Sequence, residues 1–403
     1  MEKLPLEGIK VADFTWVWTG PTTTKVLADF GATVLRIESS NRLGVWRITP
    51  PFKDDIPGPD RGAVFNSINT SKMSITIDLT KPQGKELAKK FVAWADIVTD
   101  NFAGGAMERM GLGYDVLKTI KPDIIMMSSS LMGQTGPWHT SPGYGDQLSA
   151  ISGLHEISGW PDRTPGEIGF YTDFIAPRFN AMTILAALEY RRRTGEGQHL
   201  DVAQHQSGVQ FMAPLILDYV VNNRIATRQG NYDPYAVPHG FYKCKGDDRW
   251  CAIAVFTDEQ WESFCRVMGN PAWTTDPKFA SFEKRKENEQ ELDELINEWT
   301  IEHTDEDVMN MMQTAGVGAG WLGTIEDQME NDPQLRFRNF YQEQDHPEIG
   351  KYRPPRQPCV LSKTPCKITR APLLGEHSQY ALKEILGLND NEIEDLVISE
   401  IIQ

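Results

Sequence analysis

Residues 9–37 read IKVADFTWVWTGPTTTKVLADFGATVLRI, and the pattern of this stretch decides the fold. Ile9 to Phe14 is a short apolar run typical of a buried strand. Thr22 to Phe30 has the composition of a helix, which Gly31 ends. Ala32 to Ile37 is a second apolar run of strand length. Two strands separated by one helix predict a parallel β-α-β unit.

The same alternation continues along the N-terminal half of the chain. Ser74 to Leu79 alternates like a strand, and a helix is predicted from Lys81 to Ala95 with Pro82 in its first turn. Further segments are predicted at 97–99 (strand), 114–119 (helix), 124–128 (strand), 179–193 (helix) and 200–212 (strand, then helix). This order predicts an α/β fold with a Rossmann-like, doubly wound parallel sheet.

The character of the sequence changes in its second half. Residues 224–238 are polar and aromatic with Gly and Pro, residues 240–256 predict a β-hairpin, and residues 258–315 are helical and charged. This block is typical of a smaller α+β domain. We predict three parts: residues 1–220 as the N-terminal part of a large Rossmann-like domain, 221–328 as the small domain, and 329–403 as a segment that returns to the large domain.

Composition and charge limit the possible functions. The 403 residues carry 40 basic and 56 acidic side chains, which gives a formal net charge of −16. Such a field repels nucleic acid and anionic membranes, so neither is an expected partner. No stretch has the roughly 20 apolar residues that span a bilayer, and the N-terminus lacks the apolar segment of a signal peptide. The expected location is the cytoplasm.

Neither a metal site nor a dinucleotide loop is predicted. The five cysteines include no C-x-x-C pair, and the eight histidines include no H-E-x-x-H motif. Residues 316–320, GVGAG, resemble part of a dinucleotide loop, but they follow a helix and lack the third glycine. We predict a turn that enters a strand there, which disfavours a dinucleotide-dependent oxidoreductase.

One acidic residue stands in an unusual setting. Residues 169–177, GFYTDFIAP, place Asp173 among aromatic and aliphatic side chains just before the predicted long helix, with Pro177 in its first turn. One interpretation is that Thr172 or Asp173 caps that helix. The other is a carboxylate that helix-terminal N–H groups hold ionised and aromatic neighbours partly desolvate. Such a carboxylate can attack a thioester carbonyl.

Motifs along the whole chain favour the second interpretation. The Asp173 motif, the helix after it and residues 193–198, RTGEGQ, resemble the core of the class III CoA-transferase family, which includes formyl-CoA and carnitine-CoA transferases and the succinyl-CoA:benzylsuccinate type. Further matching motifs are LEGIKV (6–11), GP (20–21), LADFGATV (27–34), IE (37–38), DL (78–79), NF (101–102), MG (110–111), GQTGP (133–137) and APLLGEH (371–377). Their order and spacing carry the resemblance.

The resemblance implies fold, assembly and chemistry together. It implies an interlocked homodimer in which the small domain is inserted into the large one. It implies a CoA-transferase that uses acyl-CoA and a free carboxylic acid, with Asp173 forming an aspartyl-CoA thioester and CoA serving as a substrate, not as a bound cofactor. The positions that match the family's CoA-binding residues are Val17, Lys72, Asn101, Phe102 and Arg109. Lys72 and Arg109 suit phosphates, although solvated surface charge is the alternative for each.

The chain departs from the family at two places that concern the substrates. Formyl-CoA transferases carry a run of glycines before the hairpin, whereas residues 230–240 here read GNYDPYAVPHG. Ser39 replaces the basic residue that usually follows the strand ending at Glu38. The first departure argues against a formyl or oxalate substrate, and the second indicates that part of the CoA site differs.

Aromatic residues near the expected site indicate the kind of acid. A bulky or aromatic acceptor fits the first turn, although core packing explains its two tryptophans equally well, and succinyl-CoA is the candidate donor. The candidate substrate-binding residues are Trp16, Trp18, Tyr144, Tyr232 and Tyr235.

Two other functions remain open at this point. Acyl-CoA α-carbon racemases share the fold and the acid, but they resemble one another in a Gly-His-Asp segment where this chain has GYG at 143–145; His139 and His155 are nearby substitutes. A non-catalytic subunit of a heteromeric CoA-transferase is the other alternative. The presence of Asp173 argues that this chain is an active partner.

Overall fold

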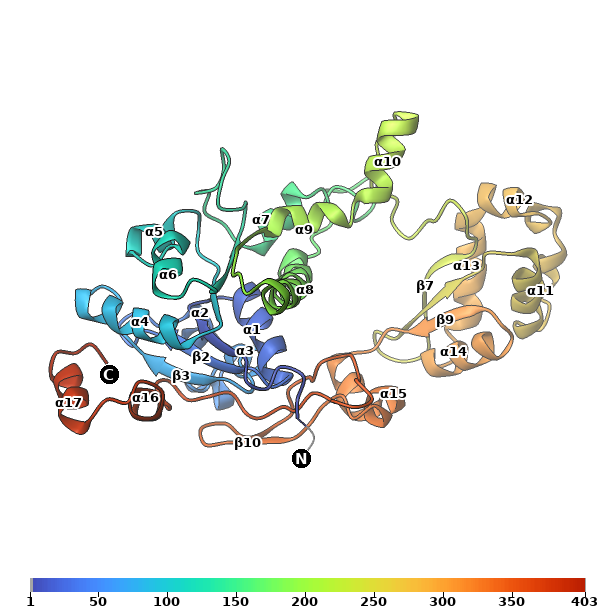
Figure 1. Ribbon diagram of the computed structural model, residues 1–403. Helices are drawn as coiled ribbons and strands as arrows, with labels where there is room; N and C mark the ends of the chain where they lie inside the picture. Colours follow the sequence, from blue (N-terminus) through green and yellow to red (C-terminus); the bar gives the residue numbers. More distant parts are fainter. Residues whose placement is uncertain (1–2, 403) are drawn as a thin grey trace. The chain divides into compact units, whose positions relative to one another are not determined.

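The computed structural model describes residues 3–402 and divides into two compact units (Figure 1). The first contains the chain up to Leu154, Ile168–Arg224, and the chain from Gln334 onward; the second contains His155–Glu167 and Ile225–Pro333. The segment His155–Glu167 therefore lies outside the unit to which the predicted limit at residue 220 assigns it. The amide of Gly230 donates to the carbonyl of Gly159 at 2.7 Å, which ties that segment to the second unit.

A six-stranded parallel sheet forms the centre of the first unit, in the order β3-β2-β1-β4-β5-β6. The strands are β1 (Lys10–Asp13), β2 (Thr33–Glu38), β3 (Met73–Thr76), β4 (Ile97–Asp100), β5 (Ile125–Ser130) and β6 (His199–Ala203). The predicted α/β class with a parallel sheet is confirmed. The strand order reverses between β1 and β4, and open α/β sheets bind their ligands beyond the carboxyl ends of the strands at such a point.

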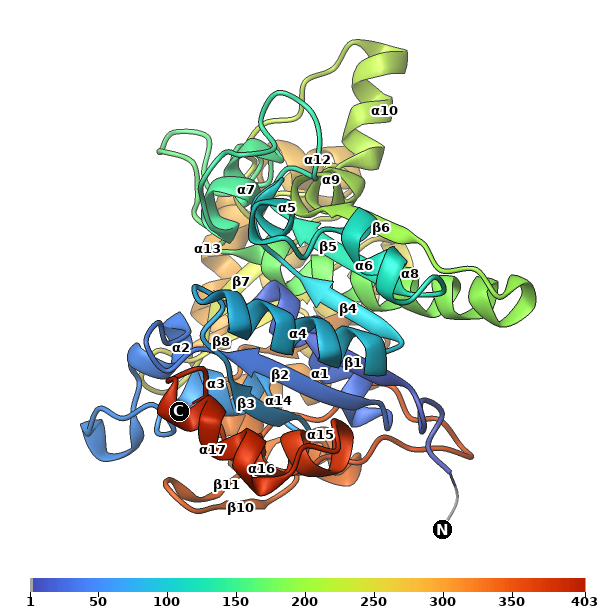
Figure 2. The same cartoon turned by 60° about the vertical axis from the view of Figure 1, so that its left-hand side comes forward.

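Helices cover both faces of this sheet because successive strand residues point to opposite sides. Ala12 and Val98 pack on one side with α4 and α6, while Val11 and Ile97 pack on the other side with α1 and α8. These helices are α1 (Thr19–Asp29), α4 (Pro82–Trp94), α6 (Tyr114–Ile120) and α8 (Tyr171–Thr194). Figure 2 shows α4 lying across the sheet and the C-terminal helices α16 (Ser378–Tyr380) and α17 (Asp390–Ile398) near β3.

Shorter helices in the first unit connect these elements. They are α2 (Val45–Ile48), α3 (Ala63–Ile68), α5 (Ala106–Met110), α7 (Gly145–Ile151), α9 (Gln204–Gln210), α10 (Ala213–Asn222) and α15 (Pro333–Phe337). Within residues 3–402, no helix combines the length and the apolar character that crossing a bilayer requires.

The long helix α8 differs from its prediction. It begins at Tyr171 rather than at Phe179, so Asp173 lies inside its first turn and Pro177 lies in its interior. An interior proline has no N–H for the carbonyl four residues earlier, and that carbonyl belongs to Asp173. Because proline is disfavoured inside a helix, the sequence predicted that Pro177 lies in the first turn.

The second unit has its own sheet and core. Its antiparallel strands are β7 (His239–Lys243), β8 (Trp250–Ala254) and β9 (Gly318–Trp321), in the order β7-β8-β9. The predicted hairpin is confirmed, and so is the strand after the GVGAG turn. The helices are α11 (Asp258–Val267), α12 (Phe282–Glu287), α13 (Glu289–Thr300) and α14 (Asp305–Thr314). Phe264, Ile296 and Val308 pack on Ile253 in the core.

Buried ion pairs lie on the β3 side of the first unit. Lys72 Nζ lies 3.3 Å from Asp13 Oδ2, Arg36 Nε lies 3.1 Å from Glu38 Oε1, and Arg47 lies 2.7 Å from Glu38 Oε2. Burial alone would raise the pKa of Glu38, but the charges of Arg47 and Arg36 outweigh it and lower that pKa to about 2. Removing one member would leave a buried charge without its partner, which is strongly destabilising.

Gly84 fixes how closely α4 approaches the end of β3, and this predicts the effect of a methyl group. A Cβ at Gly84 would lie 2.0 Å from the carbonyl oxygen of Asp78. We therefore expect Gly84→Ala to lower the free energy of unfolding by about 1–3 kcal/mol, measured by urea denaturation. Gln83→Ala, at the exposed neighbouring position, is the matched control and should stay near the wild-type value. Equal midpoints for Gly84→Ala and the wild type would show that the contact is not tight.

Candidate active site

The Asp173 carboxyl group is held by two hydrogen bonds to one oxygen. Thr19 Oγ1 donates to Asp173 Oδ1 at 2.6 Å, and Gln204 Nε2 donates to the same oxygen at 2.5 Å. Thr19 is the first residue of α1, and Gln204 is the first residue of α9, directly after β6. Among residues 3–402, no group donates a hydrogen bond to Oδ2. One oxygen is thus fixed while the other stays available to a substrate.

The backbone of α7 lies against that second oxygen. A Cβ at Gly145 would lie 2.3 Å from Asp173 Oδ2 and 2.6 Å from Phe170 Cβ. Only glycine leaves space for the carboxyl group in this position. Gly145 therefore belongs to the wall of the site although it contributes no side chain.

Three influences set the pKa of Asp173. Burial raises the pKa, the hydrogen bonds from Thr19 and Gln204 lower it, and the nearby negative charge of Asp146 raises it; the pKa ends above its ordinary value. Desolvation of a carboxylate makes it more basic than an exposed one. A partly buried carboxylate with a raised pKa beside a cavity is a frequent feature of functional sites.

Aromatic rings stand beside this carboxyl group. The Trp18 ring lies 5.4 Å from Phe170, the residue before α8, 5.2 Å from Phe174, the residue after Asp173, and 5.7 Å from Trp46. Trp18 thus packs against the segment that carries Asp173, and a substrate contact by Trp18 stays a prediction. An apolar wall here limits the access of water to a reactive intermediate.

Trp16 was also expected beside Asp173, but it lines the neighbouring cavity. The cause is Val17, the residue between the two tryptophans. Val17 has a φ of 59°, which is rare for a β-branched residue and costs about 1–3 kcal/mol. This turn directs Trp16 toward Phe102, with ring centroids 5.8 Å apart. The side chain of Asn101 fixes it there by two hydrogen bonds of 2.8 Å with the Trp16 backbone. Asn101 is therefore a positioning residue in this structure.

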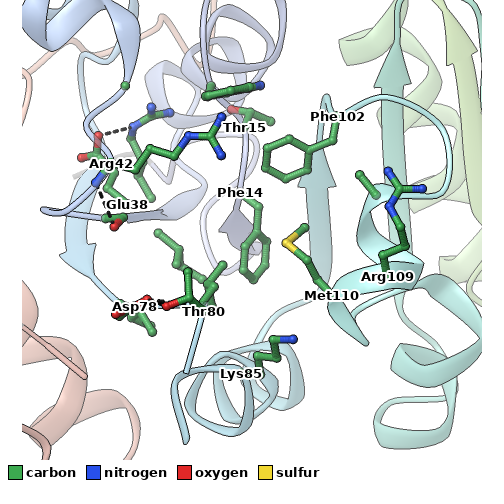
Figure 3. A pocket seen from close by; sticks show the side chains of 18 residues that line it. Phe14, Thr15, Glu38, Arg42, Asp78, Thr80, Lys85, Phe102, Arg109 and Met110 are labelled. Carbon is green, nitrogen blue, oxygen red and sulfur yellow. Dashed lines mark hydrogen bonds and ion pairs between the residues drawn. The ribbon is translucent and has the colours of Figure 1, made fainter. Parts of the chain in front are cut away.

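A cavity of about 530 Å³ lies beyond the carboxyl ends of the strands where their order reverses. Its walls come from the segments that follow β1, β2, β3 and β4. Phe102 and Arg109, two of the predicted CoA-binding residues, line it together with Phe14, Trp16, Arg42 and Met110 (Figure 3). The volume and the mixed apolar and cationic lining suit a nucleotide.

Lys72 does not line this cavity. Its Nζ donates to the carbonyl of Pro21 and to Asn69 Oδ1, both at 2.9 Å, and pairs with Asp13. The side chain has no exposed area, so it has no face to offer a phosphate. The long-range partner Asp13 explains the difference, because no local pattern links the two residues in the sequence.

The other candidate residues do not line this cavity. Tyr144 is exposed at the start of α7, and its amide donates to Gln147. His139 is held by the carbonyl of Gly136 at 2.7 Å. The second unit contains Tyr232, Tyr235 and His155. Substrate contacts by these tyrosines stay predictions.

Three residues of the site were not predicted: Thr19, Gln204 and Gly145. Thr19 directly precedes the Gly-Pro motif of the first turn, and Gln204 lies four residues after the predicted strand start at Leu200, so their positions after predicted strands were a usable signal. Nothing local marks Gly145, because its role depends on the approach of a distant helix.

A doubly wound sheet with a partly buried carboxyl group and a nucleotide-sized cavity at its reversal point is typical of an enzyme for a nucleotide-containing substrate. The chain belongs to CoA-transferase family III, whose model matches residues 6–378. The predicted family and the predicted CoA-transferase activity are thereby confirmed.

Named relatives and a solved structure agree with this family. Succinyl-CoA–D-citramalate CoA-transferase of Chloroflexus aurantiacus is 33% identical over 408 residues, which cover 99% of this chain and 98% of the relative. The alpha subunit of succinyl-CoA–L-malate CoA-transferase of the same organism is 33% identical over 404 residues, 100% of this chain and 93% of the relative. The crystal structure of a CaiB/BaiF family protein from Brucella suis is 31% identical, with a TM-score of 0.87 over 95% of this chain and 100% of that one.

The close approach of Gly145 to Asp173 predicts a loss of activity on adding a methyl group. In Gly145→Ala the new Cβ must displace the carboxyl group, and a misplacement of about 1 Å costs roughly 100-fold in rate. We expect kcat for CoA transfer to fall by about that factor while the fold, followed by circular dichroism, is retained. Gly143→Ala, whose Cβ would make only ordinary contacts, is the control. Full activity of Gly145→Ala would contradict this geometry.

Proposed function

We propose that this protein transfers CoA from an acyl-CoA donor to a carboxylic acid through an aspartyl-CoA thioester on Asp173. The observation that supports this most is the partly buried Asp173 carboxyl group, with Oδ1 fixed and Oδ2 free. The reaction needs no metal or permanently bound cofactor, because each bond that forms replaces one of similar energy.

The steps balance without a net proton transfer. Oδ2 of Asp173 attacks the donor thioester carbonyl; the C–S bond breaks, and CoA thiolate and a mixed anhydride result. The thiolate attacks the aspartyl carbonyl, which gives the aspartyl-CoA thioester and the free donor acid. The acceptor carboxylate attacks this thioester, and thiolate leaves again. The thiolate then attacks the acceptor carbonyl of the second anhydride, which gives the product thioester and restores the carboxylate.

Thr19 and Gln204 have a second role in this series of reaction steps. When the aspartyl carbonyl is attacked, negative charge develops on Oδ1, the oxygen that both side chains already hold. Donors placed in advance at a developing oxyanion are a large source of rate acceleration. The same two groups thus orient the nucleophile and stabilise the tetrahedral state.

The aromatic wall supports a bulky or aromatic acceptor acid. Trp18, Phe170 and Phe174 place apolar surface next to the reacting carboxyl group. For the donor we propose succinyl-CoA, because the two relatives from Chloroflexus aurantiacus are named as succinyl-CoA-dependent CoA-transferases. A panel of acids assayed with succinyl-CoA identifies the acceptor.

We also propose that the chain works as a dimer, either with itself or with a related subunit. Helix α10 supports this, because none of its residues is buried in the single chain and its apolar side chains Val220 and Val221 are 70% and 75% exposed. The related succinyl-CoA–L-malate CoA-transferases are named as alpha and beta subunits. These names support a heteromer as much as the exposed helix supports a homodimer.

Chemical trapping tests the covalent step. After incubation with succinyl-CoA, borohydride should reduce the aspartyl thioester, and mass spectrometry should find the change on the peptide that contains Asp173. We expect Asp173→Ala and Asp173→Asn to form no adduct and to lose CoA transfer. Wild-type transfer rates in Asp173→Asn would end the proposal. Deuterium exchange at the α-carbon without acid exchange would indicate a racemase instead.

The hydrogen bonds to Oδ1 predict a shift in the pH profile. Attack requires ionised Asp173, so kcat/KM falls as the pH drops through its pKa. Thr19 donates to the charged form and lowers that pKa, so Thr19→Val should raise it further and move the acid limb to higher pH. We also expect kcat to fall by about 10- to 100-fold.

Thr22→Val is the matched control for this shift. Thr22 lies one turn further along the same helix, and its hydroxyl makes no hydrogen bond within the described residues. Its acid limb should coincide with that of the wild type. An unmoved acid limb in Thr19→Val would show that this hydrogen bond does not act on the ionised carboxylate.

A further inference from the structure

Three basic side chains surround the floor of the cavity. Arg42, Lys85 and Arg109 stand on three sides of an apolar surface that includes Phe14 and Phe102 (Figure 3). They come from the segment after β2, from α4 and from α5. An apolar floor with separate cations around it matches a base flanked by phosphates.

These three cations differ from the other basic groups nearby. Arg36, Arg47 and Lys72 are buried and paired with carboxylates at 2.7–3.3 Å. Within residues 3–402, none of the three cavity cations forms an ion pair, and the only side-chain hydrogen bond among them runs from Arg109 to a backbone carbonyl. Positive charges gathered around one cavity of an acidic protein repel one another until an anion binds.

Arg42 lies on the side of the cavity that Trp16 lines. Its guanidinium lies 5.2 Å from the centre of the Trp16 ring. Trp16 is three residues before Thr19, whose hydroxyl contacts Asp173. The short segment from Trp16 to Thr19 thus connects this side of the cavity with the site of Asp173.

Ser39 and Asp78 complete the geometry. The Arg42 amide donates to Ser39 Oγ at 3.3 Å, so the small side chain at 39 fixes the segment that carries the cation. Asp78, whose carboxylate accepts from Thr80, lines another side of the cavity (Figure 3). A carboxylate repels phosphates and suits the amino group of an adenine. The phosphates are thus favoured on the Arg42 side.

We propose that Arg42 binds the pyrophosphate of the CoA substrate and replaces the basic residue that is absent at position 39. The inference rests on the proposed function, since it takes a CoA ester as the ligand. The adenine lies on the apolar floor, the pyrophosphate pairs with the Arg42 guanidinium, and the pantetheine arm continues past Trp16 to Asp173. Arg42 is a binding residue and takes no part in bond making.

Binding measurements with two ligands test this assignment without any chemistry. Isothermal titration with CoA and with dephospho-CoA, which keeps the pyrophosphate and lacks the 3′-phosphate, compares the wild type with Arg42→Ala. We expect Kd to rise by about 10- to 100-fold for both ligands, as for the loss of one charge-assisted hydrogen-bonded pair. Arg42→Lys should recover part of the affinity, because lysine keeps the charge without the planar fork.

Lys53→Ala controls for the loss of one positive charge on the same unit. Lys53 is outside the cavity and pairs with Asp54, so its Kd values should match those of the wild type. Unchanged affinity in Arg42→Ala, or a loss confined to CoA, would overturn the assignment to the pyrophosphate. If Asp173 is trapped as proposed while Arg42→Ala binds normally, only this inference fails. If the wild type binds neither ligand, the proposed function fails with it.

Discussion

The two hydrogen bonds to Oδ1 of Asp173 require the whole first unit to be assembled correctly. Thr19 starts the helix after β1, and Gln204 starts the helix after β6, at the far edge of the sheet from β3. In a parallel sheet the carboxyl ends of all strands meet at one edge, so distant segments can converge on one group. The position of a single oxygen therefore depends on the order and register of β1, β4, β5 and β6.

This dependence on distant segments also explains which parts of the structure could be predicted from the sequence and which could not. Apolar runs of strand length separated by helices are local signals, and the sheet and the hairpin followed from them. The setting of Asp173 among aromatic residues left a helix cap and a nucleophile open, and the family motifs along the chain favoured the nucleophile. Lys72 was expected to bind phosphate because it matches a CoA-binding position of the family, and its pairing with Asp13, which is distant in the chain, left no local signal. The direction of Trp16 depends on one backbone dihedral angle at Val17, and no composition reveals that angle.

Charge is used in two ways in the first unit. Buried pairs such as Lys72 with Asp13 and Arg47 with Glu38 offset the cost of desolvation and attach the segment before β3 to β1 and helix α2 to β2. Arg42 has no such partner in the described chain and lies at a cavity instead. The distinction follows from burial, since a buried cation without a counter-charge would lose its proton or disrupt the fold.

The turn at Val17 separates two tasks that lie side by side in the sequence. Under the proposed function, Trp16 lies at the nucleotide end of the substrate and Trp18 at the acid end, with one strained residue between them. Mutations at Trp18 would then change the choice of acid and leave the binding of CoA unchanged. A fold that separates the two parts of its site in this way can evolve toward new acids by single substitutions, because each substitution affects only one part.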